Sequence, residues 1–355
     1  MGYRTTRRGA MALAGSAATA LAGCLGAGSD APAASAPAGG PPAADRSPHL
    51  AYERDRIREG VVSGGVSKDG IPAIDDPTVV DASSASFLRD EDVVFGVVRG
   101  GTATAYPRAV LVHHEIVNDR LDGVPVSVTY CPLTGTAMGF ERGATTFGVS
   151  GDLVNSNLVM YDRATDSRWP QMLGVAVSGP LAGRPLREFD LRWTTWGRWR
   201  ARHPDGGVLS RETGYVRNYG VDPYGSYGPR RGYYARDDTM FPPLTSDDRL
   251  PAKRVVVGVR THDGAAAVTR TRLRRRGVVD LSIDGERLVI AHDDALDAAY
   301  GYRVPPAATV TAGEDGVVVD GAARPAAALP FARWPAVEAM WFAWAGFYPG
   351  TVLHA

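Results

Sequence analysis

The sequence predicts a mainly β protein, a β-rich α+β chain with a barrel- or sandwich-like core, long loops and a few short helices. From about residue 60 the chain consists of short apolar runs broken by Gly, Pro and Asp, while helix signals are few. The composition, 44% hydrophobic and 22% charged, is typical of a globular protein. It excludes disordered, collagen-like and multi-span membrane chains.

Several apolar runs have the length and residue types of strands, and turn sequences such as Asp284-Gly285 separate some of them. The basic run Arg270–Arg276 is predicted to be a solvated strand edge or turn. The stretch 253–322 is β-rich and is expected to form a lobe of its own. The predicted strands cover residues 93–98, 124–130, 145–149, 157–161, 254–259, 278–283, 287–291 and 317–320.

Two segments predict short helices. The first is capped by Thr194 or Thr195 and ends at Arg202, because threonine side chains satisfy the first free N–H groups of a helix. The second covers residues 336–347. No internal repeat of fixed period is found.

The first 23 residues are predicted to be a twin-arginine (Tat) signal peptide. Arg7-Arg8 precede a weakly apolar stretch that is too short to span a bilayer. The following Leu21-Ala22-Gly23-Cys24 has the form of a lipobox, whose cysteine receives the lipid. An ordinary signal peptide with a chance cysteine is the alternative. The whole pattern resembles Tat lipoproteins of halophilic archaea.

Residues 24–58 then comprise the lipidated cysteine and a tether of Ala, Gly, Pro and Ser, which cannot bury a core. The prediction is an exported protein, held at the outer face of the cell membrane by lipid on Cys24. Its predicted partners are the membrane lipid and an unknown substrate or partner of the cell envelope. The formal net charge is zero and no domain is strongly basic, so no nucleic-acid partner is predicted.

With Cys24 lipidated, Cys131 is the only thiol of the mature chain, and it ends an apolar strand. A thiol becomes a nucleophile when an imidazole lowers its pKa. His114 is therefore a candidate base, with Glu115 or Asn118 orienting its ring. These residues predict a thiol-dependent acyl transferase or hydrolase.

Other interpretations stay open. Cys131 can be a buried, inert thiol, or the lone thiolate of a metal site, although no histidine lies between Cys131 and Met138. No resident metal or cofactor is predicted. A third interpretation is a non-catalytic binding module that uses the aromatic loop 215–234, in which Arg217 and Tyr219 lie. This module would also use the tryptophans Trp193, Trp196 and Trp199.

Short motifs follow one another in a fixed order along the chain. They are Asp-Gly-Ile-Pro-Ala at 69–73, Ala-Tyr-Pro at 105–107, His-Glu-Ile-Val-Asn-Asp at 114–119, Thr-Tyr-Cys-Pro-Leu at 129–133, Phe-Gly-Val-Ser-Gly at 147–151, Asn-Ser-Asn-Leu-Val-Met-Tyr-Asp-Arg at 155–163, Ser-Arg-Trp-Pro-Gln at 167–171, Asp-Pro-Tyr at 222–224 and Trp-Phe-Ala-Trp at 341–344. Together they resemble domain-of-unknown-function family 3179, which occurs in exported prokaryotic proteins.

The resemblance implies that residues 59–352 form one family module, and it implies no activity, because the family has no settled one. Asn155, Asp162 and Trp169 are expected to contribute to the wall of a substrate pocket. Many members have Cys-Pro-Leu-Cys where this chain ends the same motif with Thr134. A two-thiol redox couple or metal clamp therefore cannot form here.

Overall fold

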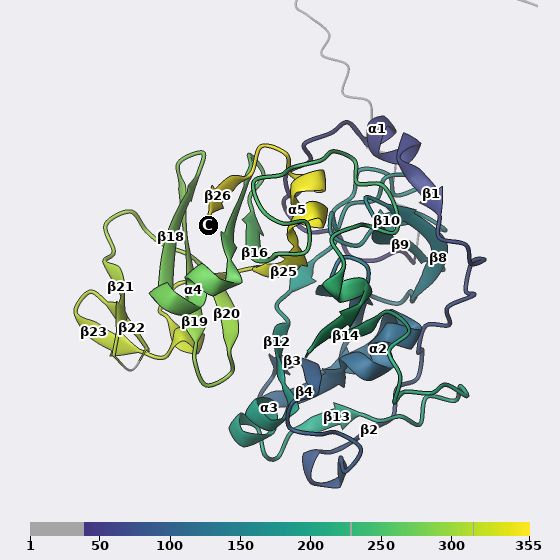
Figure 1. The fold of residues 1–355 in the computed structure, drawn as a ribbon, viewed down its shortest axis with the longest axis horizontal. Coiled ribbons are helices and arrows are strands. Elements are labelled where there is room, and N and C mark those ends of the chain that lie inside the picture. Colours follow the sequence, from purple (N-terminus) through teal and green to yellow (C-terminus); the bar gives the residue numbers. More distant parts are fainter. Residues whose placement is uncertain (1–38, 228, 315) are drawn as a thin grey trace, which may run out of the picture. The chain divides into compact units, whose positions relative to one another are not determined.

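The structure, a computed structural model, describes residues 39–227, 229–314 and 316–355 and shows a β-rich chain with short helices (Figure 1). The predicted fold class is confirmed as sandwich-like, because open sheets pack against one another through apolar side chains. From residue 39 on, the chain belongs to one compact unit. The predicted signal peptide and Cys24 lie outside the described residues. Among the described residues, no helix is long and apolar enough to cross a bilayer.

The first half of the chain builds two sheets joined by one short helix. The strands of this segment pair antiparallel with one another, and the apolar face of the helix packs between the sheets. In chain order the elements are β3 (Val93–Arg99), β4 (Thr102–Pro107), α2 (Arg108–His114), β5 (Ile116–Leu121), β6 (Val124–Cys131) and β7 (Thr136–Glu141).

A later segment completes the first of these sheets. Strand β12 (Arg192–Thr195) pairs antiparallel with β3, and β13 (Gly207–Leu209) pairs parallel with β4. Helix α3 (Trp196–Arg202) connects them and confirms the predicted helix, although the Thr195 side chain makes no capping hydrogen bond. With β2 (Val79–Asp81) at its edge, the sheet has the order β12-β3-β4-β13-β2.

The second half of the chain repeats this topology. The sheet order β25-β16-β17-β26 matches β12-β3-β4-β13, including the single parallel pair, and β18-β19-β20 matches β5-β6-β7. The elements are β16 (Val255–Arg260), β17 (Ala265–Thr269), α4 (Arg270–Arg276), β18 (Val278–Ile283), β19 (Glu286–Asp293), β20 (Ala298–Arg303), β25 (Val337–Met340), α5 (Trp341–Phe347) and β26 (Val352–His354).

Backbone details support this equivalence. Helices α2 and α4 have seven residues each, and the next residue is left-handed in both, Glu115 with φ 58° and Gly277 with φ 67°. The hairpins that follow turn through Asp122-Gly123 and Asp284-Gly285, whose φ angles are all positive. The chain therefore contains a structural repeat, although no repeat of fixed period is found in the sequence. The two copies share strand spacing and turns, and some residues such as Gly96 and Gly258 or Arg108 and Arg270 are identical.

Each copy also packs a glycine of its first strand under a tryptophan of its last helix. A Cβ atom on Gly96 would lie 2.1 Å from the ring of Trp199, and a Cβ on Gly258 would lie 2.4 Å from the ring of Trp344. Only glycine fits under these rings without displacing them. Helices α3 and α5 therefore lie directly on their strands.

The remaining elements extend or cover these sheets. Strands β11 and β24 extend the edges of the two second sheets, at β7 and β20. A small hairpin, β14–β15, leads into a 3₁₀ turn at Tyr233–Ala235. These elements are α1 (Arg54–Glu59), β1 (Val61–Ser63), β8 (Phe147–Val154), β9 (Asn157–Asp162), β10 (Arg168–Pro170), β11 (Glu188–Phe189), β14 (Gly225–Tyr227), β15 (Arg230–Gly232), β21 (Val310–Gly313), β22 (Gly316–Val319), β23 (Ala322–Arg324) and β24 (Ala332–Trp334).

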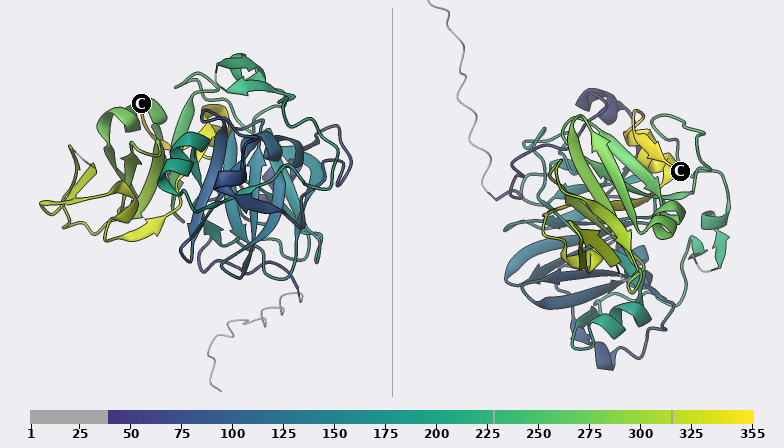
Figure 2. Two further views of the ribbon diagram at one scale, coloured as in Figure 1. Left: turned by 90° about the horizontal axis from the view of Figure 1, so that it is seen from below. Right: turned by 90° about the vertical axis from the view of Figure 1, so that its left-hand side faces the viewer.

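The two copies lie side by side and pack on one another reciprocally (Figures 1 and 2). Strand β7 of the first copy lies against β25 of the second, and β20 of the second lies against β12 of the first. One shared core joins Phe140 to Ala339, and another joins Trp196 to Tyr300. Reciprocal contacts of this kind are expected of two units related by an approximate twofold axis.

Two predicted elements are wrong. The helix expected over 336–347 begins only at Trp341, because the preceding four residues pair with β16 as strand β25. The basic run Arg270–Arg276 is helix α4, with Thr269 accepting a hydrogen bond from the Arg272 N–H and with Leu273 buried. In addition, β16 and β17 pair with β25 and β26, which lie outside the stretch 253–322 expected to form its own lobe.

Candidate functional site

Cys131 ends β6 inside a core shared by the two copies, with 1% of its surface exposed. Its Sγ donates to the Ser156 carbonyl oxygen at 3.6 Å. Burial raises the pKa of the thiol to about 11, and the Glu115 carboxylate adds to this, while the Thr134 hydroxyl opposes it and is outweighed. This direction is opposite to the lowered thiol pKa expected from the sequence, because burial disfavours the thiolate.

The His114 ring binds groups other than the thiol. Its Nδ1 lies 2.8 Å from the Pro72 carbonyl oxygen and its Nε2 lies 2.7 Å from the Tyr219 hydroxyl. Since a carbonyl only accepts, Nδ1 carries the proton and Nε2 accepts from Tyr219. Burial lowers the pKa of the imidazole. The structure corrects the proposed pairing of His114 with Cys131, because both ring nitrogens bind other groups.

Asn118 does not orient this imidazole. Its side chain donates to Asp75 at 2.7 Å and to the Phe147 carbonyl at 2.8 Å, and it accepts from Ser127 at 2.6 Å. These contacts fasten β5 to β6 and β8. The role of Asn118 is therefore structural.

Glu115 is the titratable group that the structure brings close to the thiol. It is 6% exposed, and its carboxyl group accepts no hydrogen bond from the described residues. Burial raises its pKa to about 8. Its backbone is left-handed, a conformation that costs roughly 1–2 kcal/mol for a residue with a Cβ, whereas Gly277 occupies the equivalent position in the second copy.

The other predicted site residues do not form a pocket wall. Asn155 donates to the Ala343 carbonyl at 2.7 Å and accepts from the Leu244 N–H, and Asp162 accepts from the Trp169 indole at 3.1 Å. These three side chains are buried and fix loops to the core. Arg217 and Tyr219 lie on the aromatic loop, where Arg217 is exposed and Tyr219 contacts His114.

Among the described residues no group of three or more His, Cys, Asp or Glu side chains is placed to hold a metal ion.

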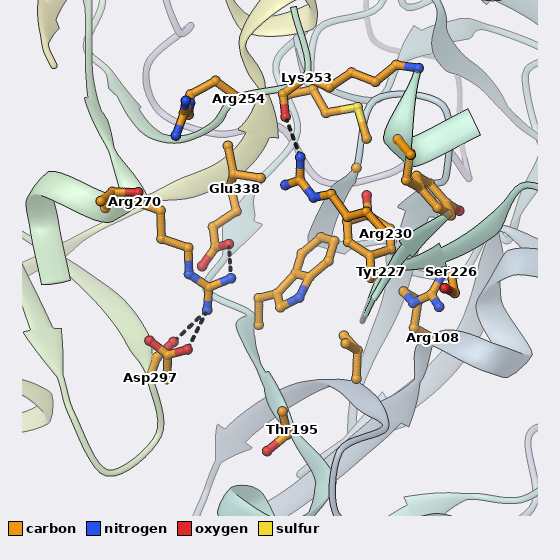
Figure 3. A pocket seen from close by; sticks show the side chains of 18 of the residues that line it. Arg108, Thr195, Ser226, Tyr227, Arg230, Lys253, Arg254, Arg270, Asp297 and Glu338 are labelled. Atoms are coloured by element: carbon orange, nitrogen blue, oxygen red, sulfur yellow. Dashed lines mark hydrogen bonds and ion pairs between the residues drawn. The ribbon is translucent and has the colours of Figure 1, made fainter. Parts of the chain in front are cut away.

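A pocket of about 800 Å³ lies where the two copies meet (Figure 3). Its volume is in the range of small-molecule sites. Matching positions of both copies line it, so the pocket lies on the approximate twofold axis. None of the residues proposed for the thiol enzyme lines it, nor do Arg217 and Tyr219, whereas Trp193 of the predicted binding module does. The equivalent pairs in the lining are Val93 and Val255, Arg108 and Arg270, and Thr195 and Met340.

The lining contains three neighbouring cations, Arg230, Lys253 and Arg254. Arg230 donates to the Lys253 backbone carbonyl at 3.3 Å, and Figure 3 shows the Lys253 and Arg254 side chains extending to opposite sides of this contact. These three form no ion pair with any described residue, whereas the other basic side chains of the lining pair with carboxylates. The paired residues are Arg89, Arg108, Arg236, Arg270 and Arg274.

Aromatic rings line the same pocket. The ring centroids of Tyr227 and Tyr234 are 4.2 Å apart, and Trp193 lies edge-on to Tyr227 at 5.5 Å. The Arg108 guanidinium lies 4.8 Å from the Tyr227 centroid and pairs with Asp222, which fixes this cluster. The aromatic loop thus reaches the pocket with its second half, not with the half that holds Arg217 and Tyr219.

Sequence reasoning missed the three cations. Their signal is weak, because Arg230 and Lys253 are 23 positions apart and neither lies in a recognisable motif. Only the approach of β15 to the segment before β16 brings them together. By contrast, the aromatic content of the loop 215–234 did point to Tyr227 and Tyr234.

Comparison with known proteins matches residues 68–351 to the family described as "Protein of unknown function (DUF3179)". No curated protein and no solved structure matches the chain. The matched residues include all the elements of the first copy, and all those of the second except β26. The chain therefore belongs to the DUF3179 family of proteins of unknown function.

Proposed function

We propose that this protein binds an anionic organic ligand in the pocket between its two copies. The observation that carries the proposal is the group of Arg230, Lys253 and Arg254, which has no carboxylate partner among the described residues. Adjacent cations repel one another and contribute little to folding. An anion bound in the pocket beside the unpaired guanidiniums would supply the missing counter-charge through charge-assisted hydrogen bonds.

The aromatic rings support binding of an organic anion rather than a simple ion. Trp193 and Tyr227 are partly exposed in the lining, so their faces and edges are accessible to a ring or a carbon chain. The site thus combines an anion-binding wall with apolar contact area. This arrangement favours the binding-module interpretation over catalysis at Cys131.

Anionic compounds are expected to raise the melting temperature of the protein, while their neutral analogues are not. At a free concentration one hundred times the dissociation constant, a ligand stabilises the folded state by about 2.7 kcal/mol, or roughly 4 °C for a chain of this size. A thermal-shift screen with matched pairs, such as galacturonate and galactose, measures this. Equal shifts with both members of every pair would contradict an anion site.

A thiol-dependent acyl transfer or hydrolysis is the second candidate. One observation favours it: the buried Glu115 carboxyl, with no hydrogen-bond donor among the described residues, lies close to the Cys131 thiol. In this candidate Glu115 replaces His114 as the base. It needs a thiolate, which the burial of Cys131 opposes.

Labelling with iodoacetamide separates the two candidates. With the pKa of the thiol raised to about 11, native Cys131 is expected to react roughly 100-fold or more slowly at pH 8 than the unfolded chain. The rate is followed by intact mass, with a Cys131→Ser variant as the blank. Rapid labelling of the native protein at this pH would reverse the preference in favour of the thiol enzyme.

The proposed binding protein is exported and held at the outer face of the membrane by lipid on Cys24. Support comes from the Arg7-Arg8 pair and the lipobox ending at Cys24. A Cys24→Ser variant is expected to move from the membrane pellet to the soluble fraction, while a Cys131→Ser variant stays in the pellet. Retention of Cys24→Ser in the pellet would show that another feature anchors the chain.

A further inference from the structure

Helix α4 extends the basic side of the pocket to the protein surface. Arg270 and Thr271 line the pocket, and Arg274, about one turn after Arg270, also lines it. Arg275 follows Thr271 by the same spacing, so it lies on the same side of the helix, one turn beyond the lining. Its side chain is exposed and forms no ion pair with any described residue. A free cation therefore stands next to the pocket, outside it.

The pocket also offers acceptors for hydroxyl groups. Asp237 is exposed in the lining and forms no ion pair with any described residue. Glu338 pairs with one cation, Arg270, at 3.1 Å (Figure 3). A carboxylate has about four acceptor positions, so both groups can accept further hydrogen bonds. The ligand is thus expected to carry hydroxyl donors as well as negative charge.

We infer that this ligand is an acidic polysaccharide, with one sugar acid in the pocket and the next units of the chain along α4. The inference rests on the proposed function, since Arg230 and Arg254 are the groups that bind the acid of the first unit. Trp193 and Tyr227 supply rings against which the carbon face of a sugar packs. Arg275 then meets the negative charge of a following unit.

The acidic residues of the lining separate this ligand from other polyanions. Asp237 and Glu338 repel the phosphates of a nucleic acid, which has few hydroxyl groups to donate to them. A sugar acid carries several hydroxyl groups beside each negative charge. A chain of sugar acids therefore matches both the basic and the acidic groups of the site.

Titration calorimetry with galacturonate, its hexamer and a hyaluronan hexasaccharide tests the inference. We expect at least one of the two oligomers to bind about tenfold or more tightly than galacturonate, because its added units contact Arg275. Arg275→Glu is expected to weaken binding of this oligomer by about tenfold and to leave galacturonate binding within about twofold. Arg56→Glu, at an exposed and unpaired position on α1 outside the lining, is the matched charge reversal and should bind like the wild type. Thermal unfolding checks that both variants keep the fold.

The alternative outcomes are distinguishable. Equal binding of the oligomer by Arg275→Glu and the wild type, or equally tight binding of a six-residue oligothymidylate, would overturn the inference. The same holds if neither oligomer binds more tightly than galacturonate, but the proposed anion site then stands. The proposed function fails as well only if no anion of the thermal-shift screen stabilises the protein.

Discussion

Replacing Trp344 by alanine is expected to lower the free energy of unfolding by about 3–5 kcal/mol, the usual cost of emptying a buried tryptophan site. Trp344 is fully buried, lies on Gly258, and donates from Nε1 to the Thr351 hydroxyl at 3.0 Å. Its ring also packs 4.6 Å from that of Tyr348. The substitution therefore removes both a large apolar contact and a hydrogen bond.

The equivalent substitution in the first copy provides the matched comparison. Trp199→Ala is expected to cost a similar amount, because Trp199 lies on Gly96 in the same way. The phenylalanine variants should differ: Trp344→Phe leaves Thr351 unpartnered, whereas the Nε1 of Trp199 has no partner among the described residues. Urea denaturation of all four variants measures these differences. A loss below about 1 kcal/mol for Trp199→Ala would contradict the equivalence of the two copies.

The second large effect is a pH dependence that Glu115→Gln is expected to remove. Burial raises the pKa of Glu115 to about 8 in the folded protein, against about 4.3 in the unfolded chain. Between these values the folded state holds a proton that the unfolded state has lost. The stability contributed by Glu115 is therefore full below pH 4 and falls as the pH rises through 8, by about 4 kcal/mol between pH 5 and pH 8.

The measurement is urea denaturation of the wild type and of Glu115→Gln at pH 5, 6.5 and 8. As the pH rises, the free energy of unfolding of the wild type is expected to fall relative to that of Glu115→Gln, because the amide of the variant does not titrate. Glu59→Gln, at an exposed position on α1, controls for the loss of a carboxylate and should follow the wild type. Parallel curves for Glu115→Gln and the wild type would show that the Glu115 carboxyl is solvated in the folded state.

Most of the strands could be predicted because the residues within each segment are enough to indicate a strand. Apolar runs of five to eight residues between glycines and aspartates already specify strands such as β18 and β19. The segment before Trp341 could not be assigned in this way, because its strand state depends on pairing with β16. Helix α4 was missed since its single buried apolar residue, Leu273, gives almost no periodic signal.

The internal repeat was hidden for a related reason. The copies share strand order, two left-handed turns and a glycine under a tryptophan. The spacing from β3 to β7 is the same as from β16 to β20, but the segment before the next paired strand, residues 142–191 against 304–336, differs in length. A search for one fixed period therefore fails. The copies also differ at the two positions of the thiol hypothesis that lie close together. The first copy has Glu115 and Cys131 where the second has Gly277 and Asp293.

The site was predicted less well than the fold. A lone thiol and nearby titratable residues indicated Cys131 and His114. In the structure the two side chains bind different groups, His114 the Tyr219 hydroxyl and Cys131 the Ser156 carbonyl. The pocket is built from β12, β15 and the strands at the junction of the two copies, segments that are far apart in the sequence. Its basic residues line one pocket only when the second copy is packed on the first.

The central claim, an anion site at the junction of the two copies, is tested most directly by isothermal titration calorimetry of a double variant. The titrant is the anion that gives the largest thermal shift. Arg230→Ala/Arg254→Ala removes two charge-assisted contacts and is expected to weaken binding by about 100-fold or more, while Arg236→Ala, whose guanidinium pairs with Asp238 in the same pocket, should stay within about threefold of the wild type. A double variant that binds the anion as tightly as the wild type would contradict the account.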